Sequence, residues 1–473
     1  MGMTPQEFLG HERWLNGLTL DTIRRMFREQ GADQLFCKVL GTNNNSKQQI
    51  YVAQDVSEMA WIPTGSVEPV PSTSGKGTGR RGPIFRFPVR MAWITPGGAV
   101  EPVRAAKLIA YPQYPEVRLS GFLAGADNAP SFLMNENQRG HDPGRLLFLA
   151  PRHDGTLFAL CVPPESAAAR EFASLDIPDR RGVFARLRLD TQSSRSGLEE
   201  LMERLCSIHR QGWISARILG KDGIERDCRG SNCGGYTLEA RLGIQANGVA
   251  EPDFMEWELK TRAVPDIDRP GTSTVTLMTP EPDGGAYVTQ GIGSFIRHWG
   301  YRDKQGRPDR LNFGGIYRCG MQAHADTHLA MHLEGYDGDS GTFTGAGALL
   351  LADAGGTVAA SWSFAKLLDH WKRKHTHTAY IPCQMRRKPG LEYRYGNEIT
   401  LAEGAEFRRF LRALMRGTVY YDPGIKLEGV SSPAPKTKRR SQLRVKSTDL
   451  GALYSSMRIE RACRGEASDQ EDI

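Results

Sequence analysis

The feature that most constrains this chain is a short charged pattern near its middle. Asp253 is followed, after a gap of turn length, by Glu258-Leu259-Lys260. If residues 257–261 form a strand, Glu258 and Lys260 project from the same face, because side chains alternate along a strand. Asp253, just before that strand, can bring a second carboxylate to the same point. The pattern therefore predicts a strand that gathers two acids and one lysine at one place.

That grouping suits a metal-dependent hydrolysis of phosphodiesters. Two carboxylates and a backbone carbonyl are the hard oxygen ligands that Mg²⁺ accepts while it keeps waters and binds phosphate. We expect Asp253, Glu258 and the Leu259 carbonyl to hold the metal, and Lys260 to stabilise or deprotonate the attacking water. A solvated strand edge with a salt bridge can show the same pattern by chance. The residues around the pattern must therefore distinguish a catalytic site from a salt bridge.

The segment before Asp253 supports the catalytic interpretation. Gly235-Tyr-Thr-Leu-Glu239 is typical of the start of a helix, with Thr237 as a candidate cap. From Gly235 to Lys260 the chain resembles the MvaI/BcnI restriction endonucleases and their relative MutH, the nicking enzyme of mismatch repair. The resemblance continues through segments near residues 295–313 and 420–428, and so extends over about residues 200–450.

This resemblance implies a catalytic set and a fold. It assigns Glu239, Asp253, Glu258 and Lys260 as catalytic residues, with Asp253 and Glu258 on the metal and Glu239 supporting it. The implied fold is α/β, a PD-(D/E)xK restriction-endonuclease-like mixed sheet with flanking helices. The implied activity is that of a Mg²⁺-dependent type II site-specific deoxyribonuclease, acting as a monomer on a short, G/C-rich site in double-stranded DNA. A DNA methyltransferase that protects host DNA is the implied genetic partner.

Two other functions remain open from the sequence. A strand-specific nicking enzyme of the MutH kind would depend on a protein activator, and the extra amino-terminal region disfavours it. A non-catalytic DNA-binding protein could keep the nuclease scaffold, but it would have no need for Asp253, Glu258 and Lys260 together.

Basic and histidine side chains further along the chain are candidates for contacts with phosphates or guanine edges. The first group lies in a loop that contains Gly and Pro, where a solvated loop is the plain alternative. The second follows a helix rich in Lys and Arg, and related enzymes use His and Arg from one loop to read G and C bases. The expected DNA-binding residues here are Arg302, Lys304, Arg310, His375, His377, Arg386 and Arg387.

The amino-terminal region has a different pattern, in which short apolar or β-branched runs such as 49–53, 84–94 and 145–150 alternate with Gly, Pro and Asn clusters. This predicts a mostly β domain. The Asn-rich stretch 35–51 resembles the start of the B3-like DNA-binding domain, a pseudobarrel, that forms the effector part of EcoRII. The resemblance implies that Asn43 and Asn44 contact DNA, and that DNA bound there stimulates cleavage at a second copy. Asparagines that merely satisfy turns are the alternative.

The length of 473 residues predicts two to three domains. We expect a β-rich domain at 1–195, a catalytic domain at 198–450 that opens with a helix at 197–209, and a carboxy-terminal tail at 451–473. Helical spacing of apolar residues also predicts helices at about 1–30, 364–374 and 406–415.

Composition sets looser limits. The formal charge of +7 suits a polyanionic partner without requiring one. The chain lacks an apolar run long enough to span a membrane, and its start does not resemble a secretory signal, so we expect a cytoplasmic protein. Its eight cysteines are then expected to be reduced thiols.

Overall fold

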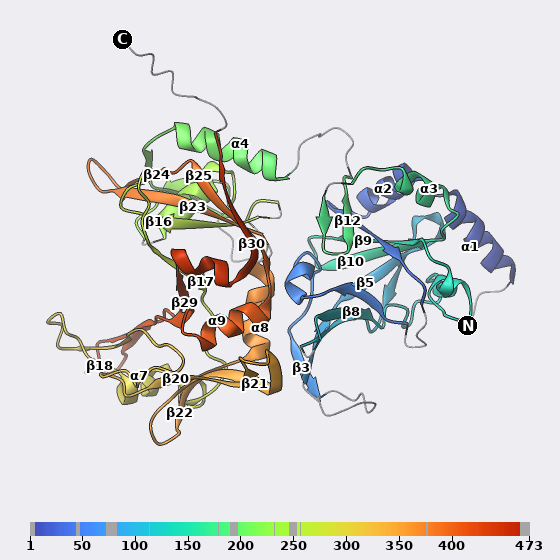
Figure 1. Cartoon of the computed structure of the whole chain (residues 1–473). Helices are drawn as coiled ribbons and strands as arrows, with labels where there is room; N and C mark the ends of the chain where they lie inside the picture. Colours follow the sequence, from blue (N-terminus) through green and yellow to red (C-terminus); the bar gives the residue numbers. More distant parts are fainter. Residues whose placement is uncertain are drawn as a thin grey trace, which may run out of the picture. The chain divides into compact units, whose positions relative to one another are not determined.

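A computed structural model describes residues 5–43, 48–71, 83–112, 114–177, 179–189, 197–230, 232–245, 253–255, 257–374 and 377–463. The contacts within the chain define two compact units, Met1–Ser194 and Arg195–Ile473 (Figure 1). We call them unit 1 and unit 2.

Unit 1 is mostly β, as its sequence pattern predicts. Its helices are α1 (Pro5–Gly17), α2 (Leu20–Glu29) and α3 (Ala167–Ala173). One sheet contains, in spatial order, β11 (Arg180–Arg181), β12 (Phe184–Leu187), β1 (Leu35–Leu40), β9 (Arg145–Pro151), β10 (Thr156–Val162), β5 (Arg90–Ile94) and β6 (Val100–Val103). The other contains β2 (Ile50–Ala53), β8 (Glu116–Ser120), β7 (Lys107–Tyr111), β4 (Pro83–Pro88) and β3 (Glu68–Pro71).

The sequences of the unit 1 strands explain much of this arrangement. Strands β9 and β10 are apolar at nearly every position and buried along nearly their whole length, as expected for central strands covered on both faces. The run 84–94 is not one strand, because Pro88 lacks the amide hydrogen that a continuing ladder needs, and β4 and β5 join different sheets. In the described part of unit 1 neither sheet closes on itself, and the B3-like pseudobarrel therefore stays a prediction.

Unit 2 is built around a mixed sheet, in agreement with the α/β prediction (Figure 1). Strand β16 (Glu258–Ala263) runs parallel to β23, and the other pairs of this central sheet are antiparallel. The remaining strands of the sheet are, in spatial order, β13 (Ile214–Ser215), β24 (Glu392–Tyr395), β23 (His377–Arg386), β25 (Glu398–Ala405) and β30 (Tyr454–Arg461).

Smaller sheets complete unit 2. They comprise β14 (Arg217–Leu219) with β15 (Glu225–Asp227); β17 (Thr274–Met278), β29 (Leu443–Lys446) and β26 (Tyr420–Tyr421); β18 (Tyr301–Arg302), β19 (Arg310–Gly314), β27 (Gly424–Glu428) and β28 (Lys436–Lys438); and β20 (Ala330–Asp337), β21 (Thr342–Ala352) and β22 (Val358–Ser363). The helices are α4 (Gly197–Arg210), α5 (Cys233–Arg241), α6 (Ala286–Thr289), α7 (Ile292–Trp299), α8 (Phe364–Lys374) and α9 (Phe407–Met415), with a 3₁₀ segment η5 (Ser447–Ala452).

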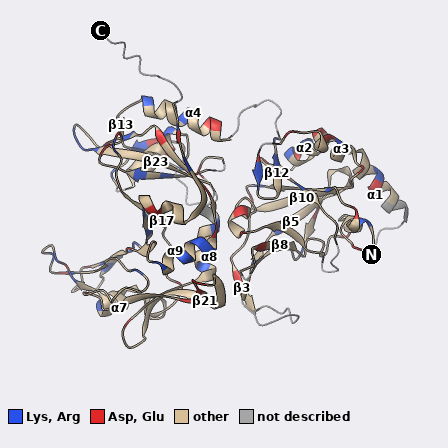
Figure 2. Cartoon of the chain, viewed as in Figure 1, with Lys and Arg blue, Asp and Glu red and all other residues tan. Residues whose placement is uncertain are grey.

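The helices predicted from apolar spacing are confirmed at α4, α8 and α9. In α9 the aromatic and leucine side chains at 407, 410, 411 and 414 are buried. Arg412 and Arg416 lie on the opposite, exposed side, and Figure 2 shows basic residues on α8 and α9. A helix with one apolar stripe is stable only when that stripe is packed, and α9 contacts both α8 and β20.

The carboxy-terminal boundary differs from our prediction. Residues 454–461 were assigned to a tail, but they form β30, which pairs with β25 from Tyr454 opposite Ala405 to Arg461 opposite Glu398. The strand was missed because it is an edge strand with mostly polar, exposed side chains, which carry little apolar signal.

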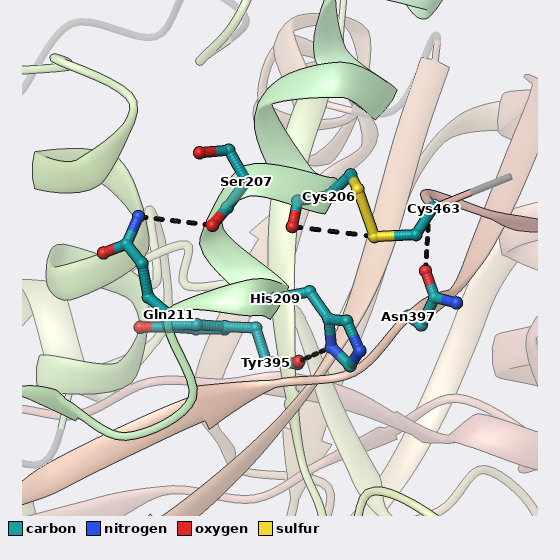
Figure 3. The surroundings of a disulfide bond; sticks show 7 residues. All are labelled: Cys206, Ser207, His209, Gln211, Tyr395, Asn397 and Cys463. Carbon is teal, nitrogen blue, oxygen red and sulfur yellow. Dashed lines mark hydrogen bonds between the residues drawn. A yellow bond between two sulfur atoms is a disulfide. The ribbon is translucent and has the colours of Figure 1, made fainter. Parts of the chain in front are cut away.

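The prediction that all cysteines are reduced is wrong for four of them in this structure. Disulfides join Cys206 to Cys463 and Cys228 to Cys233, whereas Cys37, Cys161, Cys319 and Cys383 are free. Figure 3 shows Cys206 on α4 beside the end of β30, where Asn397 Oδ1 accepts a hydrogen bond from the Cys463 amide at 2.7 Å. The partners are 257 residues apart in sequence, so only the fold reveals this pair.

None of the helices in the described residues is long and apolar enough to cross a membrane.

Candidate active site

The predicted strand is present as β16, and its partner β23 fixes the position of the charged residues. Glu258 lies opposite Thr378, and Lys260 lies opposite Tyr380. On the other side of β23, Tyr380 lies opposite Thr400 of β25. Lys260, Tyr380 and Thr400 therefore form one row across the same face of the central sheet.

The alternate residues of these strands face the other way. Leu259, Ile381 and Leu401 belong to a buried apolar cluster that includes Leu205 of α4 and Leu238 of α5. Because that face is occupied by the core, the charged residues of β16 must lie on the opposite face. The alternation of apolar and charged residues in β16 thus decides where the chemistry is located.

A tight turn before β16 positions Asp253. Backbone hydrogen bonds join the Phe254 amide to the Trp257 carbonyl at 3.0 Å and the Trp257 amide to the Phe254 carbonyl at 2.8 Å. Met255 in this turn has φ of 51°, in the left-handed region that is uncommon outside glycine. The turn folds Asp253 back toward β16, where its Oδ2 accepts a hydrogen bond from the Leu259 amide at 2.9 Å.

Glu258 and Lys260 form a close pair at the start of β16. Lys260 Nζ lies 3.1 Å from Glu258 Oε1, and the side chains are only 14% and 6% exposed, respectively. A buried pair of this kind gains little net stability, because removing both charges from water offsets their attraction. Keeping this buried ion pair in the strand therefore costs free energy of folding. Such a cost is typical of residues that are kept for function.

Hydroxyl groups surround the Glu258 side of this face. Tyr380 and Tyr454 place their hydroxyl oxygens 2.7 Å apart, and the Tyr454 hydroxyl donates to Thr378 Oγ1 at 3.2 Å. Burial, with a smaller contribution from the Glu258 carboxylate, raises the pKa of Tyr454 to about 12. These tyrosines are therefore neutral hydrogen-bonding groups beside the charged pair.

Glu239 lies on α5 and is half-buried. A Cβ added at Gly235, one turn earlier, would lie 3.8 Å from both Glu239 Oε1 and Thr261 Oγ1, so Glu239 approaches β16 near Thr261. Thr261 is on the opposite face of the strand from Lys260. The predicted cap Thr237 is not a cap, because α5 begins at Cys233; its hydroxyl instead accepts from the Arg217 amide at 3.0 Å.

The donor set fits a hard divalent cation. Asp253 and Glu258 supply carboxylates on either side of the Leu259 peptide group, whose carbonyl is a third oxygen. Within the described ranges, no three His, Cys, Asp or Glu side chains are close enough together to hold a metal ion. Glu239 therefore does not join Asp253 and Glu258 as a third side-chain ligand in this arrangement.

The predicted DNA-binding residues of the first loop occupy different environments. Arg302 is exposed on β18, and Lys304 is exposed but lies 2.7 Å from Asp326. Arg310 is only 7% exposed, and its guanidinium lies between Glu428 at 2.5 Å and Asp303 at 3.6 Å. Arg310 thus joins β19 to β27 as a buried ion pair and is not an open cation.

His377, Arg386 and Arg387 do not lie in one loop. His377 begins β23 and Arg386 ends it, so nine residue steps of about 3.3 Å separate them by about 30 Å. His377 packs beside Trp257 at the start of the active-site strand, with ring centroids 5.4 Å apart. Arg386 pairs with Glu392 at 2.6 Å and covers the ring of Trp213, whereas Arg387 is exposed.

Two of the candidate residues, Asn44 and His375, lie outside the described residues. Asn43 is described, and its side-chain amide donates to the Met134 carbonyl at 2.7 Å. It lines a hollow of about 240 Å³ in unit 1, together with Lys38, Tyr51 and Arg145.

Sequence reasoning missed the polar residues that the other strands contribute to the active-site face. Tyr380 and Tyr454 come from β23 and β30, and no local pattern links them to Glu258. Arg262 could have been found, because it lies two residues after Lys260 on the same strand and so points to the same face.

A mixed sheet whose edge strand carries an acid and a lysine on one face, with a second acid beside them, is the arrangement expected of a metal-dependent nuclease. Residues 202–454 match the family model described as the MvaI/BcnI restriction endonuclease family. The chain therefore belongs to the MvaI/BcnI restriction endonuclease family, and it is an enzyme of the type II deoxyribonuclease class. None of the curated proteins compared with the chain is significantly similar to it.

Two solved structures match part of the chain. One is the complex of restriction endonuclease MvaI with its cognate DNA substrate, at 18% identity and a TM-score of 0.42, covering 57% of this chain and 100% of that one. The other is MvaI in the absence of DNA, at 16% identity and a TM-score of 0.30, covering 57% of this chain and 99% of that one.

Proposed function

We propose that the protein is a Mg²⁺-dependent endonuclease that cuts double-stranded DNA at a short, G/C-rich, specific site. The observation that carries this proposal is the arrangement at β16. Asp253 is bound to the Leu259 amide at 2.9 Å, next to the Glu258–Lys260 pair at 3.1 Å. Family membership supports DNA cleavage, and this geometry supplies the residues for it.

Each residue has a separate task in this proposal. Asp253, Glu258 and the Leu259 carbonyl would hold the metal. When bound there, Mg²⁺ polarises the scissile phosphate and lowers the pKa of a coordinated water. Lys260, held beside Glu258, orients the attacking water and stabilises the negative charge that develops on the phosphate. Glu239 approaches β16 from α5 on the face opposite Lys260, and its proposed role is to support the strand that carries the site.

Digestion of unmethylated plasmid DNA with Mg²⁺ tests the assignment. Wild type should give discrete fragments whose ends, once sequenced, reveal the site and the position of the cut. Asp253→Ala and Lys260→Ala should abolish these fragments while DNA binding without Mg²⁺ is retained. Matched controls are Asp339→Ala and Lys221→Ala, because both residues are exposed in turns outside the central sheet, between β20 and β21 and between β14 and β15. Undiminished cleavage by Asp253→Ala would overturn the assignment.

We further propose that unit 1 is a B3-like effector domain, with residues 1–195 as its extent, and that the catalytic domain begins at residue 198 and includes β30. Its mostly β character and the hollow that Asn43 lines with the basic residues Lys38 and Arg145 support binding of a second DNA copy, with Asn44 as a further proposed contact. Adding an oligonucleotide that carries the site should then accelerate cleavage of a one-site plasmid by wild type and not by Asn43→Ala. An equal response of both proteins would count against the proposal.

The same proposal includes contacts between DNA and the two exposed arginines Arg302 and Arg387. It also retains Lys304, His375, His377 and Arg386 as candidates, since Lys304 and Arg386 could exchange an acidic partner for phosphate. The proposed setting is a cytoplasmic monomer, with a cognate DNA methyltransferase as its genetic partner.

A further inference from the structure

A hollow of about 400 Å³ lies on the active-site face of the central sheet. Its walls include Arg262, Tyr380, Thr400, Ser447, Met457 and Arg458. Tyr380 and Thr400 belong to the row of Lys260, and Arg262 follows Lys260 by two residues on the same face. The hollow therefore begins next to the catalytic lysine.

The two arginines in this hollow differ in their partners. Arg458 is balanced by two carboxylates, Glu403 at 2.6 Å and Glu460 at 2.7 Å. Arg262 is bound to neutral groups, since it donates to the Gly271 carbonyl at 3.1 Å and to Ser447 Oγ at 3.5 Å. Among the described residues no carboxylate lies within ion-pair distance of Arg262.

The contacts of Arg262 hold its guanidinium in place without neutralising it. Ser447 Oγ also accepts from the Ser273 amide at 3.0 Å, and the Ser447 amide donates to the Ser273 carbonyl at 2.8 Å, so this wall is fixed by backbone. Burial lowers the pKa of Arg262, and no acid opposes that shift. A partly buried cation without a counter-charge costs free energy, which a bound anion would recover.

The chemistry of the hollow selects a phosphate as that anion. A guanidinium forms paired, charge-assisted hydrogen bonds with phosphate oxygens, and the hydroxyl of Ser447 is a further possible donor. The step from Lys260 to Arg262 along β16 is about 6.6 Å, so a phosphate held by Arg262 would be close to one held at Lys260.

We propose that this hollow is a phosphate-binding subsite, in which Arg262 holds a backbone phosphate of the DNA strand adjacent to the phosphate that is cut. The subsite rests on the proposed function, because that function places the scissile phosphate at Lys260. It fixes the register of the strand on β16, and it adds a contact outside the metal site.

Replacement of single DNA phosphates by neutral methylphosphonates tests the subsite. The duplexes carry the sequence found by plasmid digestion or, if wild type does not cut, a sequence selected by binding. Binding is measured in Ca²⁺ without Mg²⁺ for wild type, Arg262→Gln, Arg262→Lys and Arg458→Gln. Wild type should lose affinity roughly tenfold at one position near the cut, the scale of one charged hydrogen-bonding contact.

Arg262→Gln should bind unmodified DNA with the affinity that wild type has for the duplex modified at the critical phosphate. The methylphosphonate at that phosphate should weaken the binding of Arg262→Gln no further. Its affinity should also depend less on salt, with the logarithmic slope reduced by about 0.9. Arg262→Lys should recover part of the affinity, and Arg458→Gln, the matched control, should respond to every modification as wild type does.

If the loss caused by Arg262→Gln adds to the loss caused by the methylphosphonate at every position, the subsite is overturned. The subsite is also overturned if Arg262→Gln binds DNA with the same affinity and the same salt dependence as wild type. A variant that merely folds poorly would lose affinity for all duplexes equally, which is the additive result. Wild type that binds with this pattern but does not cut would refute the proposed cleavage and leave the subsite intact. Cleavage without the pattern would refute only the subsite.

Discussion

The two faces of the central sheet in unit 2 come from the same strands but differ in kind. One face buries Leu259, Ile381 and Leu401 beneath α4 and α5. The other carries the Glu258–Lys260 pair and a network of hydroxyl groups. Strand alternation thus allows neighbouring residues to serve stability and chemistry separately. We expect substitutions on the polar face to change the rate of cleavage, and those on the apolar face to change stability.

The largest expected effect is on the polar side, at Asp253. Asn at this position keeps an oxygen that can accept from the Leu259 amide but loses the charge that a divalent cation requires. Asp253→Asn should lower the single-turnover cleavage rate by about 1000-fold or more, a loss of about 4 kcal/mol of transition-state stabilisation. Thermal unfolding should be nearly unchanged. A large loss of stability with a normal rate in the folded fraction would break the comparison.

The apolar face should respond in the opposite way. Ile381 is completely buried, and Ile381→Ala removes three carbons from a packed core. The expected cost is about 2–5 kcal/mol in the free energy of unfolding, measured by urea denaturation. The rate per folded molecule should remain close to that of wild type at a temperature where the variant is folded. If the rate falls as far as it does for Asp253→Asn, the faces are not independent.

The disulfide between Cys206 and Cys463 also tests the apolar face, because it joins α4, which packs on that face, to the end of β30. Cys463→Ser should destabilise unit 2 by about 2–4 kcal/mol under oxidising conditions. Under reducing conditions the variant and wild type should become alike. Urea midpoints in both buffers provide the measurement. A difference that persists after complete reduction would assign the effect to the side chain and not to the bond.

The smallest effect is expected at Tyr454, whose pKa burial raises from 10 to about 12. Because the folded state holds this proton more tightly, its contribution to stability is complete below pH 10 and is lost as the pH rises from 10 to 12. Tyr454→Phe should cost about 1 kcal/mol at pH 9, through the lost hydrogen bonds to Tyr380 and Thr378. By pH 11 that difference should shrink by about 1 kcal/mol. Urea midpoints for both proteins that differ equally at pH 9 and pH 11 would contradict this account.

Local patterns in the sequence were sufficient for the parts of the fold that depend on one segment. The period of two in β16 predicted a strand with its acid and lysine on one face, and apolar spacing predicted α4, α8 and α9. These predictions succeed because the signal and the structure share the same few residues.

Features that depend on distant segments could not be predicted in this way. Cys463 and Tyr454 reach the catalytic unit's sheet through β30, whose own sequence carries little apolar signal. Arg310 looked like a loop cation, but besides Asp303 of the same loop it pairs with Glu428 of β27, which is distant in sequence. His377 and Arg386 lie close together in sequence but at opposite ends of a long strand. In each case the missing information is a pairing between segments.

The bond between Cys206 and Cys463 also joins the first helix of unit 2, α4, to the last described residue, with the Cα atoms 4.8 Å apart. A fold whose first helix is covalently joined to its last described strand resists fraying at that edge, since neither element can separate without the other. In the oxidised protein the edge strand β30 is thus held by a covalent clamp as well as by its ladder with β25.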